Sequence, residues 1–306
     1  MFSILKKIIG KLHGKNLGKI PGLRWLRQFL FERLKPKEIT TINVSAGGGS
    51  SSGGQDFKLM VDPNDKGVAQ YLLLYGVFGE YETELVKNLV KPGMTVVDVG
   101  ANIGYFTVIF SRLVGNSGKV YAFEPDPYNY NLLSQNIKLN NLSNVVLIPK
   151  ALSNKAGKIK LFLDKTNLGN MSFAAQNISD DGGAIDVETT TLDDYLGGQK
   201  ADFIKIDVQG AEGLVLGGAE KTLQNSPLKI LMEFWPYGLK NLGADPLALL
   251  RSLENEGFKI KILNPQKHQL EVSSAEGTLS VADNRPEGKG AANLLLEKQG
   301  MNPVRR

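Results

Sequence analysis

The segment from Asp98 to Gly104 reads DVGANIG and comes at the end of an apolar run. It contains one acidic residue and two glycines. Glycines at positions 100 and 104 let the backbone turn tightly and approach a ligand closely, and a helical pattern follows at once. Position 102 is Asn, so the segment is not the G-x-G-x-x-G of dinucleotide enzymes. Glu124 ends the next apolar run, where a carboxylate accepts hydrogen bonds from ribose hydroxyls in nucleotide-binding folds. The pattern predicts a nucleotide-type ligand.

Two more carboxylates end later apolar runs: Asp207 follows FIKI, and Glu233 lies in LMEF. Acids therefore stand at the carboxyl ends of four predicted strands, the edge at which open α/β sheets bind ligands. Asp207 would hold the amine of a cofactor, bind a substrate hydroxyl, or cap the helix that follows. Lys205 precedes it within the strand. An unpaired buried lysine is costly, so Lys205 would pair with a carboxylate of the site or extend to the sheet edge.

A sheet must carry these side chains, and from about residue 94 short apolar runs alternate with helical patterns. This alternation is typical of a parallel sheet covered by helices. Seven strands are predicted, near 94–99, 119–124, 144–149, 202–207, 228–234, 258–263 and 292–297. Helices are predicted near 81–90, 104–114, 126–140, 211–224 and 244–256. Two β-like pieces within 157–190 predict a hairpin insertion. The expected fold is α/β, a seven-stranded doubly wound sheet.

The N-terminal segment, residues 1–44, differs in charge from the rest of the chain. Residues 1–37 hold ten Lys or Arg and one acid, a net charge of +9, whereas the other 269 residues carry −4. Apolar residues recur at spacings of three and four from Leu23 to Leu34, which predicts a helical extension. Two interpretations stay open: the helices cap the main domain, or they lie on an anionic membrane with Trp25 at the interface.

A Gly/Ser-rich tract separates this extension from the main domain. Residues 45–55 read SAGGGSSSGGQ, and nine of these eleven residues are Gly or Ser. Such a tract cannot bury apolar surface and is typical of a flexible linker or loop. The predicted domains are therefore a basic amphipathic extension over 1–44, a linker or loop over 45–55, and the main domain over 56–306.

Composition excludes several kinds of site. The chain has no cysteine, which excludes disulfide frameworks, zinc–thiolate sites, iron–sulfur clusters and cysteine nucleophiles. Its two histidines leave little room for a His-rich metal site, and we predict no bound metal. No apolar run is long enough for a membrane-spanning helix. The absence of cysteine suits the cytoplasm. Because the excess positive charge is confined to residues 1–37, we expect no nucleic-acid partner.

Six segments carry a resemblance to a known family: GVFGEYETE (76–84), VVDVGANIGYFT (96–107), AFEPDPYNYNLL (122–133), TLDDYL (191–196), FIKIDVQGAEGLVLGGA (203–219) and LMEF (231–234). Together they resemble the FkbM family of S-adenosylmethionine-dependent methyltransferases, over about residues 58–297. The resemblance implies a class I methyltransferase fold, which is Rossmann-like, and O-methylation of hydroxyls on sugars or polyketide-type products. The family pattern often has Glu where Gln209 stands, which weakens any role for position 209 as a general base.

The resemblance also implies a set of residues that bind S-adenosylmethionine. The methionine-side loop would consist of Asp98, Gly100, Asn102 and Gly104. Glu124 would bind the ribose, and the backbone near Ala151 would meet the adenine. Tyr81 and Glu82 would close over the cofactor, and Asp207 would face the site of methyl transfer.

A neutral hydroxyl is a poor nucleophile, so O-methylation is helped by a nearby base. Four candidates stay open, namely Asp207, Glu212, Glu233 and His268. The predicted activity is O-methylation of a sugar, glycolipid or polyketide-type acceptor in the cytoplasm, with an anionic membrane surface as a partner of residues 1–37. The alternative is a non-catalytic cofactor-binding module that its basic N-terminus tethers to membrane or nucleic acid.

Overall fold

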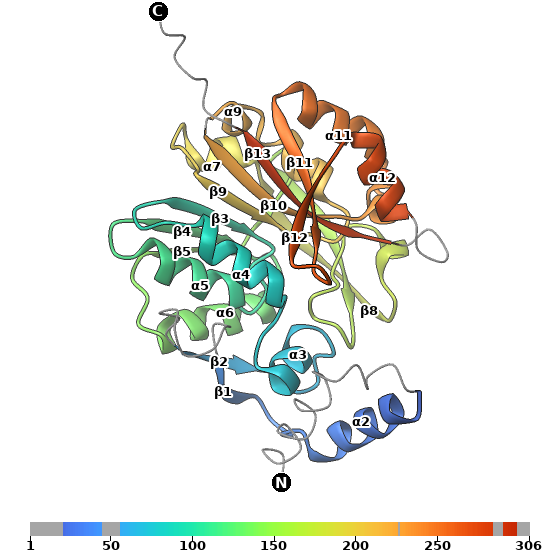
Figure 1. Ribbon diagram of the computed structural model, residues 1–306. Coiled ribbons are helices and arrows are strands. Elements are labelled where there is room, and N and C mark those ends of the chain that lie inside the picture. The colour runs from blue at the N-terminus through green and yellow to red at the C-terminus, as the bar shows by residue number, and fades with distance from the viewer. Residues whose placement is uncertain (1–20, 45–55, 226, 284–289, 299–306) are drawn as a thin grey trace, which may run out of the picture.

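The computed structural model describes residues 21–44, 56–225, 227–283 and 290–298. Its centre is an eight-stranded sheet with the strand order β12-β11-β13-β10-β9-β3-β4-β5 (Figure 1). The strands of this sheet are β3 (Thr95–Val99), β4 (Lys119–Phe123), β5 (Val145–Ile148), β9 (Phe203–Ile206), β10 (Leu228–Phe234), β11 (Phe258–Asn264), β12 (Gln269–Ser273) and β13 (Ala292–Lys298). The first predicted helical run, within residues 1–20, and the tract 45–55 lie outside the described residues.

The strand order reverses between β3 and β9. From β3 the chain proceeds to β4 and β5 on one side, and it later returns to β9 and β10 on the other, with all these neighbours parallel. Strand β13 lies antiparallel between β10 and β11. In a sheet of this kind, ligands bind outside the carboxyl ends of the strands at the point of reversal. The topology therefore directs attention to the ends of β3, β4, β9 and β10.

Helices cover both faces of the sheet (Figure 1). They are α3 (Val68–Tyr75), α4 (Glu80–Leu89), α5 (Tyr105–Val114), α6 (Pro127–Leu139), α7 (Leu192–Leu196), α8 (Glu212–Gly217), α9 (Glu220–Leu223), α10 (Pro236–Asn241), α11 (Pro246–Asn255) and α12 (Ala275–Asp283). Side chains along each strand point alternately to the two faces of the sheet, so a cluster of buried apolar side chains forms on each face. On β3, Val96 packs with α5 on one face, and Val97 and Val99 pack on the other. None of the described helices combines the length and apolar character needed to cross a bilayer.

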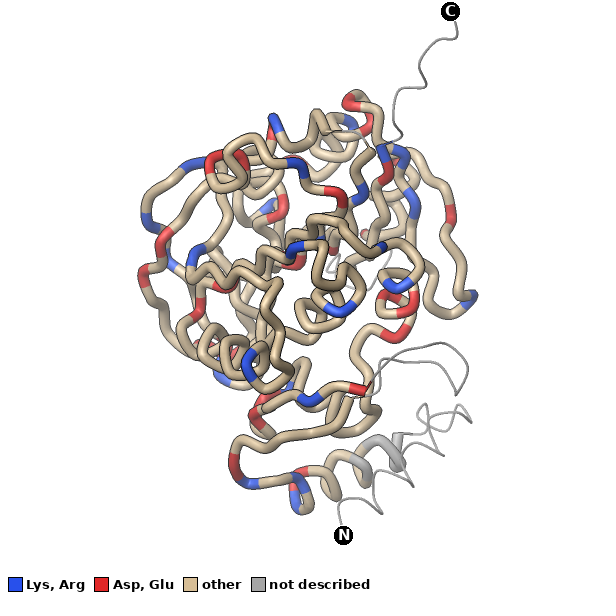
Figure 2. The backbone as a smooth tube through the Cα atoms, turned by 90° about the vertical axis from the view of Figure 1, so that its left-hand side faces the viewer, with Lys and Arg blue, Asp and Glu red and all other residues tan. Residues whose placement is uncertain are grey.

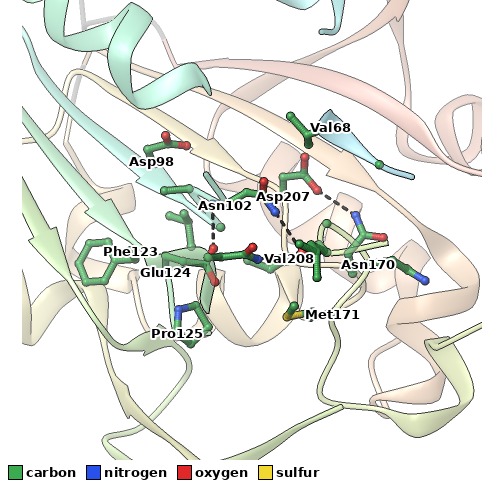
Figure 3. Close-up of a pocket in the computed structure, with 18 of the residues that line it drawn as sticks. Val68, Asp98, Asn102, Phe123, Glu124, Pro125, Asn170, Met171, Asp207 and Val208 are labelled. Atoms are coloured by element: carbon green, nitrogen blue, oxygen red, sulfur yellow. Dashed lines mark hydrogen bonds between the residues drawn. The ribbon is translucent and has the colours of Figure 1, made fainter. Parts of the chain in front are cut away.

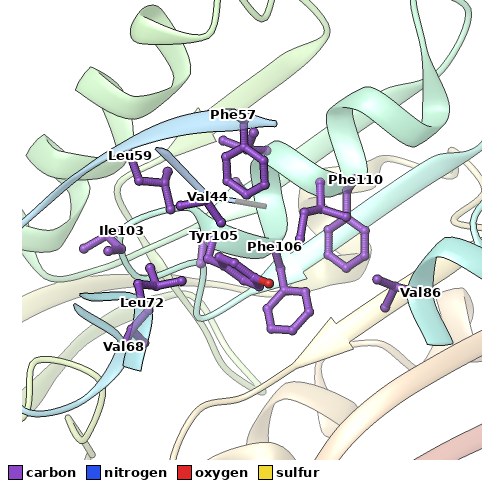
Figure 4. Close-up of a cluster of buried hydrophobic side chains, with 14 of the residues drawn as sticks. Val44, Phe57, Leu59, Val68, Leu72, Val86, Ile103, Tyr105, Phe106 and Phe110 are labelled. Carbon is purple, nitrogen blue, oxygen red and sulfur yellow. The ribbon is translucent and has the colours of Figure 1, made fainter. Parts of the chain in front are cut away.

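An antiparallel hairpin joins the N-terminal extension to the main domain. Strand β1 (Thr40–Val44) pairs with β2 (Phe57–Val61) along its whole length. The side chains of Val44 and Phe57 enter the core beside Tyr105 and Phe106 of α5 (Figure 4). Residues 40–44 are thus a strand rather than part of a helical extension, and the hairpin spans the predicted boundary at 45–55.

Helix α2 (Pro21–Leu34) occupies the predicted second helical run of the extension. Phe31 is buried in the core, whereas Trp25 is 67% exposed and Phe29 is 42% exposed. The rings of Trp25 and Phe29 stack with centroids 5.3 Å apart. One side of this helix therefore docks on the domain and another presents aromatic rings to solvent.

The predicted hairpin insertion forms a small sheet of its own. Strands β7 (Gly157–Asp164) and β8 (Asp181–Thr190) pair antiparallel, and β6 (Ala151–Leu152) adds to β8. The loop between β7 and β8 contains a short 3-10 turn, η2 (Ala175–Asn177). This loop, residues 165–180, returns toward the carboxyl ends of the main strands, where it contributes to the site described below.

The seven predicted strands of the main sheet are all present. The structure adds an eighth, β12, at the sheet edge in a segment where no strand was predicted, and helix α12 follows it. Strand β12 is largely exposed and carries few apolar residues, so its sequence gives little periodic signal. The predicted helix over 211–224 is broken into α8 and α9 at Gly218, where a side chain would come within 2.1 Å of the Ser153 carbonyl oxygen.

Candidate active site

A cavity of about 380 Å³ opens at the carboxyl ends of the parallel strands, where the strand order reverses (Figure 3). Its walls come from the turns after β3, β4 and β9, from Glu233 within β10, from α3, and from the loop between β7 and β8. Of the residues predicted from the sequence, Asp98, Gly100, Asn102, Glu124, Ala151, Asp207 and Glu233 line it. The cavity is large enough for a small ligand and lies where the topology directs one.

The turn from β3 into α5 forms the floor of one end of the cavity. Gly100 has φ +81°, and a side chain there would come within 2.0 Å of the Asp207 carbonyl oxygen. Gly104 has φ +92° and packs against Leu133, which leaves no room for a side chain. Asn102 also adopts a left-handed conformation, with φ +52°. The turn therefore needs glycine at 100 and 104 for both backbone angle and space.

Glu124 is buried beside this turn, and backbone groups hold its carboxylate. The amide of Asn102 donates to Oε2 over 2.7 Å, and the amide of Asp126 donates to Oε1 over 2.9 Å. Burial raises the pKa of Glu124 to about 8, although the two backbone hydrogen bonds work in the opposite direction. Asp126 itself caps α6 by accepting from the amide of Asn129. Glu124 thus presents a fixed, poorly solvated acceptor to the cavity.

Three side-chain oxygens at this end are buried without a hydrogen-bond donor in the described part of the chain: Asp98 Oδ1, Asn102 Oδ1 and Asn129 Oδ1. Buried acceptors of this kind need donors. S-adenosylmethionine supplies an ammonium group and two ribose hydroxyls, all of which are donors, so the residues present fit this cofactor. Asp98 is further held by Thr107, whose hydroxyl donates over 2.6 Å.

The loop between β7 and β8 is fastened to this end of the cavity through one residue, Leu168. Its carbonyl oxygen accepts from the Nδ2 atoms of Asn102 over 3.0 Å and of Asn129 over 2.8 Å. Its amide donates to Asp65 Oδ1 over 3.0 Å. Asp65 also caps α3, because it accepts from the amides of Gly67 and Ala69. Asn129 and Leu168 were not predicted as site residues, and nothing in their local sequence signals these contacts.

The other end of the cavity carries charged side chains from β9 and β10. Alternation along the strands places Asp98, Lys205 and Glu233 on the same sheet face, and Asp98 and Lys205 are register partners. Lys205 Nζ lies 3.2 Å from Asp207 Oδ2 and 4.9 Å from the centre of the Phe106 ring. Burial works to lower the pKa of Lys205, but the carboxylates of Asp207 and Asp98 outweigh it and raise the pKa. Lys205 therefore pairs with a carboxylate of the site.

Gln209 connects the two carboxylates of this end. Its Nε2 donates to Asp207 Oδ1 over 2.9 Å and to Glu233 Oε2 over 2.7 Å. Desolvation in the cavity wall, followed by the negative charges of Asp207 and Glu212, raises the pKa of Glu233 well above its ordinary value.

Aromatic side chains complete this end, namely Tyr71, Phe78, Tyr105 and Phe106, whereas Met171 and Phe173 line the cavity and pack against the cluster of Ala151. Tyr71 and Phe78 pack edge to face with centroids 5.9 Å apart, and Tyr71 is half exposed. Lys66 also lines the cavity. The residues from α3 and from the loop between β7 and β8 were not predicted, because only the fold brings them to the strand ends.

Apart from Gly104, which belongs to the turn after β3, four residues named from the sequence do not line the cavity: Tyr81, Glu82, Glu212 and His268. His268 is exposed in the turn between β11 and β12, where its Nδ1 lies 3.4 Å from Glu84 Oε2 and its ring contacts Tyr81. Glu82 accepts from Asn293 Nδ2 over 2.6 Å. The β11–β12 hairpin thus carries His268 to α4, so we do not include these residues in the site proposed below.

Comparisons with known proteins identify a family and several relatives. The Methyltransferase FkbM domain family matches residues 98–260. The methyltransferase sdnD of Sordaria araneosa is 31% identical over 197 residues, which are 54% of this chain and 73% of that protein. The 2-O-methyltransferase NoeI of Sinorhizobium fredii is 29% identical over 156 residues, which are 46% of this chain and 63% of that protein.

The solved structures that resemble this chain include the methyltransferase FkbM of Methylobacillus flagellatus, at 14% identity and a TM-score of 0.39. That alignment covers 75% of this chain and 52% of the other. The strand order and the family match together assign a Rossmann-like methyltransferase fold, with S-adenosylmethionine as the cofactor. The family match covers more than half of the chain, from the acid that ends β3 to β11, and we conclude that this protein belongs to the FkbM-domain methyltransferases.

Proposed function

We propose that this methyltransferase acts on a hydroxyl group of a sugar, glycolipid or polyketide-type acceptor. The observation that carries the proposal is the pair of carboxylates, Asp207 and Glu233, at the opposite end of the cavity from Glu124. A hydroxyl must lose its proton as its oxygen is methylated, and carboxylates are suitable proton acceptors. The name of NoeI, a 2-O-methyltransferase, is consistent with an oxygen acceptor.

The cofactor supplies an activated methyl group, so the work of the protein is to orient the acceptor and to exclude water. Glu124, Asp98 and the amide oxygens of Asn102 and Asn129 would hold the cofactor through its hydroxyl and ammonium donors. The backbone near Ala151 would meet the adenine. Asp207 and Glu233 would receive the acceptor hydroxyl, and the rings of Tyr71 and Phe78 would pack against its apolar faces.

An acceptor screen tests this proposal. The full chain is incubated with S-adenosylmethionine and with a free monosaccharide, an alkyl glycoside or a macrolactone polyol, and products are read by a mass gain of one methyl group. We expect methylation at oxygen in at least one class, and loss of it in a Glu124→Gln variant that still folds. Methylation confined to nitrogen or carbon acceptors would contradict the proposal.

We also propose that helix α2 places the enzyme on an anionic membrane at the cytoplasmic face. Residues 1–37 carry a net charge of +9, and the exposed side of α2 presents the stacked rings of Trp25 and Phe29. Each basic residue near such a surface contributes about 1 kcal/mol, and aromatic burial adds to it. In the view of Figure 2, acidic and basic residues are interspersed along the backbone of the main domain.

Co-sedimentation with vesicles tests the membrane proposal. The full chain should bind phosphatidylglycerol vesicles, bind them less as salt is raised, and not bind phosphatidylcholine vesicles. A Trp25→Ala/Phe29→Ala variant should bind several-fold less. A Val272→Ala variant is the control, because Val272 is 76% exposed on the edge strand β12 and lies outside α2. Equal sedimentation with both kinds of vesicle would contradict this proposal and leave the acceptor proposal untouched.

A further inference from the structure

The two carboxylates at the acceptor end of the cavity differ in how their oxygens are used. Both oxygens of Asp207 accept: Oδ2 from Lys205 Nζ over 3.2 Å, and Oδ1 from Gln209 Nε2 over 2.9 Å. Glu233 accepts only at Oε2, from Gln209 over 2.7 Å. No donor in the described part of the chain reaches Glu233 Oε1. The same amide therefore occupies one oxygen of each carboxylate and leaves one oxygen of Glu233 available.

Because of this difference, the two carboxylates lose different interactions when they take up a proton. A proton taken up by Asp207 would forfeit its ion pair with the ammonium of Lys205, which is buried and has no other ion-pair partner among the described residues. A proton taken up at Glu233 Oε1 would forfeit no hydrogen bond. Desolvation and the neighbouring negative charges also raise the pKa of Glu233. A carboxylate with a raised pKa is a stronger base near neutral pH.

Gln209 is held in place from its backbone as well as from its side chain. Its φ is +51°, a left-handed conformation that is unfavourable for a residue with a side chain. The carbonyl oxygen of Gln209 accepts from Ser172 Oγ over 2.7 Å and from Asn177 Nδ2 over 3.1 Å. Both donors belong to the loop between β7 and β8. The strained backbone and the loop together fix the direction of the amide that joins Asp207 to Glu233.

We propose that Glu233, through Oε1, is the base that accepts the proton of the acceptor hydroxyl, and that Gln209 is the residue that positions it. The inference rests on the proposed function, O-methylation. In the balanced step the hydroxyl oxygen forms a bond to the methyl carbon, its proton passes to Glu233 Oε1, and the sulfur of the methyl donor keeps the electron pair of the bond that breaks. The protonated Glu233 later returns its proton to solvent.

Other charged groups face this carboxyl group from each neighbouring strand and helix. Lys205 lies on β9, Asp207 follows it, and Glu212 begins α8, whereas Asp98 on β3 is the register partner of Lys205. Asp207 and Glu212 raise the pKa of Glu233, and Lys205 and the Gln209 hydrogen bond lower it. Loss of the hydrogen bond from Gln209 must therefore raise the pKa of Glu233 further. Because the ionised form is the base, the rate should fall as pH decreases through this pKa, and losing the donor should move that fall to higher pH.

Substitution of each carboxylate separates the two candidates. With octyl glucoside as the hydroxyl probe, Glu233→Gln should lower kcat by about 10²–10⁴-fold and abolish the acidic fall in rate. Asp207→Asn should keep that acidic fall. Binding of S-adenosylhomocysteine, measured by calorimetry, should change by less than threefold in Glu233→Gln. An acidic fall that persists in Glu233→Gln and vanishes in Asp207→Asn would assign the base to Asp207 and overturn the proposal.

A second measurement needs no turnover. Infrared difference spectra of the protein without cofactor, recorded along a pH titration, should contain a protonated carboxyl band of Glu233 in addition to the band of Glu124, and both should disappear at a pH well above the usual glutamate range. The Glu233 band should be absent in Glu233→Gln and present in Asp207→Asn and in Glu124→Gln. If the wild-type protein methylates no hydroxyl at all, the proposed function fails. If hydroxyls are methylated but this band is unchanged in Glu233→Gln, only the present inference fails.

The role of Gln209 is tested by variants of matched size. Gln209→Met keeps the length but removes the donor, and it should shift the acidic fall in rate to higher pH with KM for octyl glucoside little changed. Gln209→Glu adds a third carboxylate and should shift the acidic fall in rate to still higher pH. Gln199→Met is the control, because Gln199 accepts from Tyr121 outside the cavity. A lowered kcat in Gln209→Met with an unshifted pH profile would show a merely structural role and overturn this assignment.

Discussion

The two ends of the cavity are built from different parts of the sequence. Most of the cofactor end comes from one continuous stretch, β3–α5–β4–α6, with its backbone turns and the acceptors Asp98, Glu124 and Asn129, and later segments add Ala151 and Leu168. The acceptor end combines the start of α5 with α3, the loop between β7 and β8, β9 and β10, most of which lie far apart along the chain. The first end depends on backbone conformation within one βαβα unit. The second depends on how distant segments pack, so its specificity can change while the cofactor end is preserved.

The largest effect should follow from filling the backbone turn. In a Gly100→Ala variant, the added Cβ atom would lie 2.0 Å from the Asp207 carbonyl oxygen. The turn after β3 and the segment that contains Asp207 must therefore move apart. We expect the Kd for S-adenosylhomocysteine to rise about 100-fold, equivalent to about 2.7 kcal/mol, in calorimetry. Gly115→Ala is the control, because Gly115 has φ +63° but open space around it. Equal affinities in the two variants would show that the close approach at Gly100 is unimportant.

A smaller effect should follow at Glu124. Glu124→Gln replaces a charged acceptor by a neutral one, and the affinity for the cofactor should fall about 10–100-fold. The pH dependence has a definite sign. The pKa of Glu124 is raised to about 8 in the empty site, and ribose hydroxyls favour the ionised form. Binding near pH 7 should therefore release a proton, and affinity should rise with pH until about 8.

Calorimetry in two buffers of different ionisation enthalpy measures that proton. The wild-type protein should give different apparent enthalpies in the two buffers, and Glu124→Gln should give nearly the same enthalpy in both. A wild-type enthalpy that is independent of the buffer would contradict the protonated state of Glu124 in the empty site.

The contrast between the two ends also explains what the sequence could predict. The turn from Asp98 to Gly104 and the acid at Glu124 are recognisable because the glycine spacing and the strand ends are local features. Asp207 and Glu233 were predicted to lie at the same edge because both end parallel strands. The roles of Tyr71 and Leu168 could not be predicted, because their segments reach the site only through packing against the sheet. His268 was misplaced for the same reason: the β11–β12 hairpin that carries it toward α4 has little periodic signal.

Asn129 links the two ends, and its loss should have an intermediate effect on both. Asn129→Ala removes a hydrogen bond to the Leu168 carbonyl oxygen and a buried acceptor at the cofactor end. We expect about a fivefold weaker cofactor affinity and a similar rise in the acceptor KM, since one neutral hydrogen bond contributes about 1 kcal/mol. Asn140→Ala, later on the same side of α6 and bonded to Lys58, is the control. A change in only one of the two constants would show that the ends are independent.

The smallest effect should be that of chelation. Within the described residues, no group of three or more His, Asp or Glu side chains is arranged to hold a metal ion. We expect methyl transfer to continue at an unchanged rate in EDTA, measured with the acceptor found in the screen. Complete loss of activity that added magnesium restores would contradict this prediction and would mean that the acids of the acceptor end serve as ligands.

The β1–β2 hairpin determines which cuts, insertions and truncations near the Gly/Ser tract leave the fold intact. Val44 pairs with Phe57, so residues 45–55 leave and re-enter the fold at neighbouring positions. A protease nick within the tract would leave the two fragments joined by five residue pairs and by the shared core. Doubling its length would change the closure entropy by only about 0.6 kcal/mol. A truncation at Phe57 would instead strip β2 of its partner and open an unpaired edge, so removal of α2 alone requires a chain that begins near Thr40.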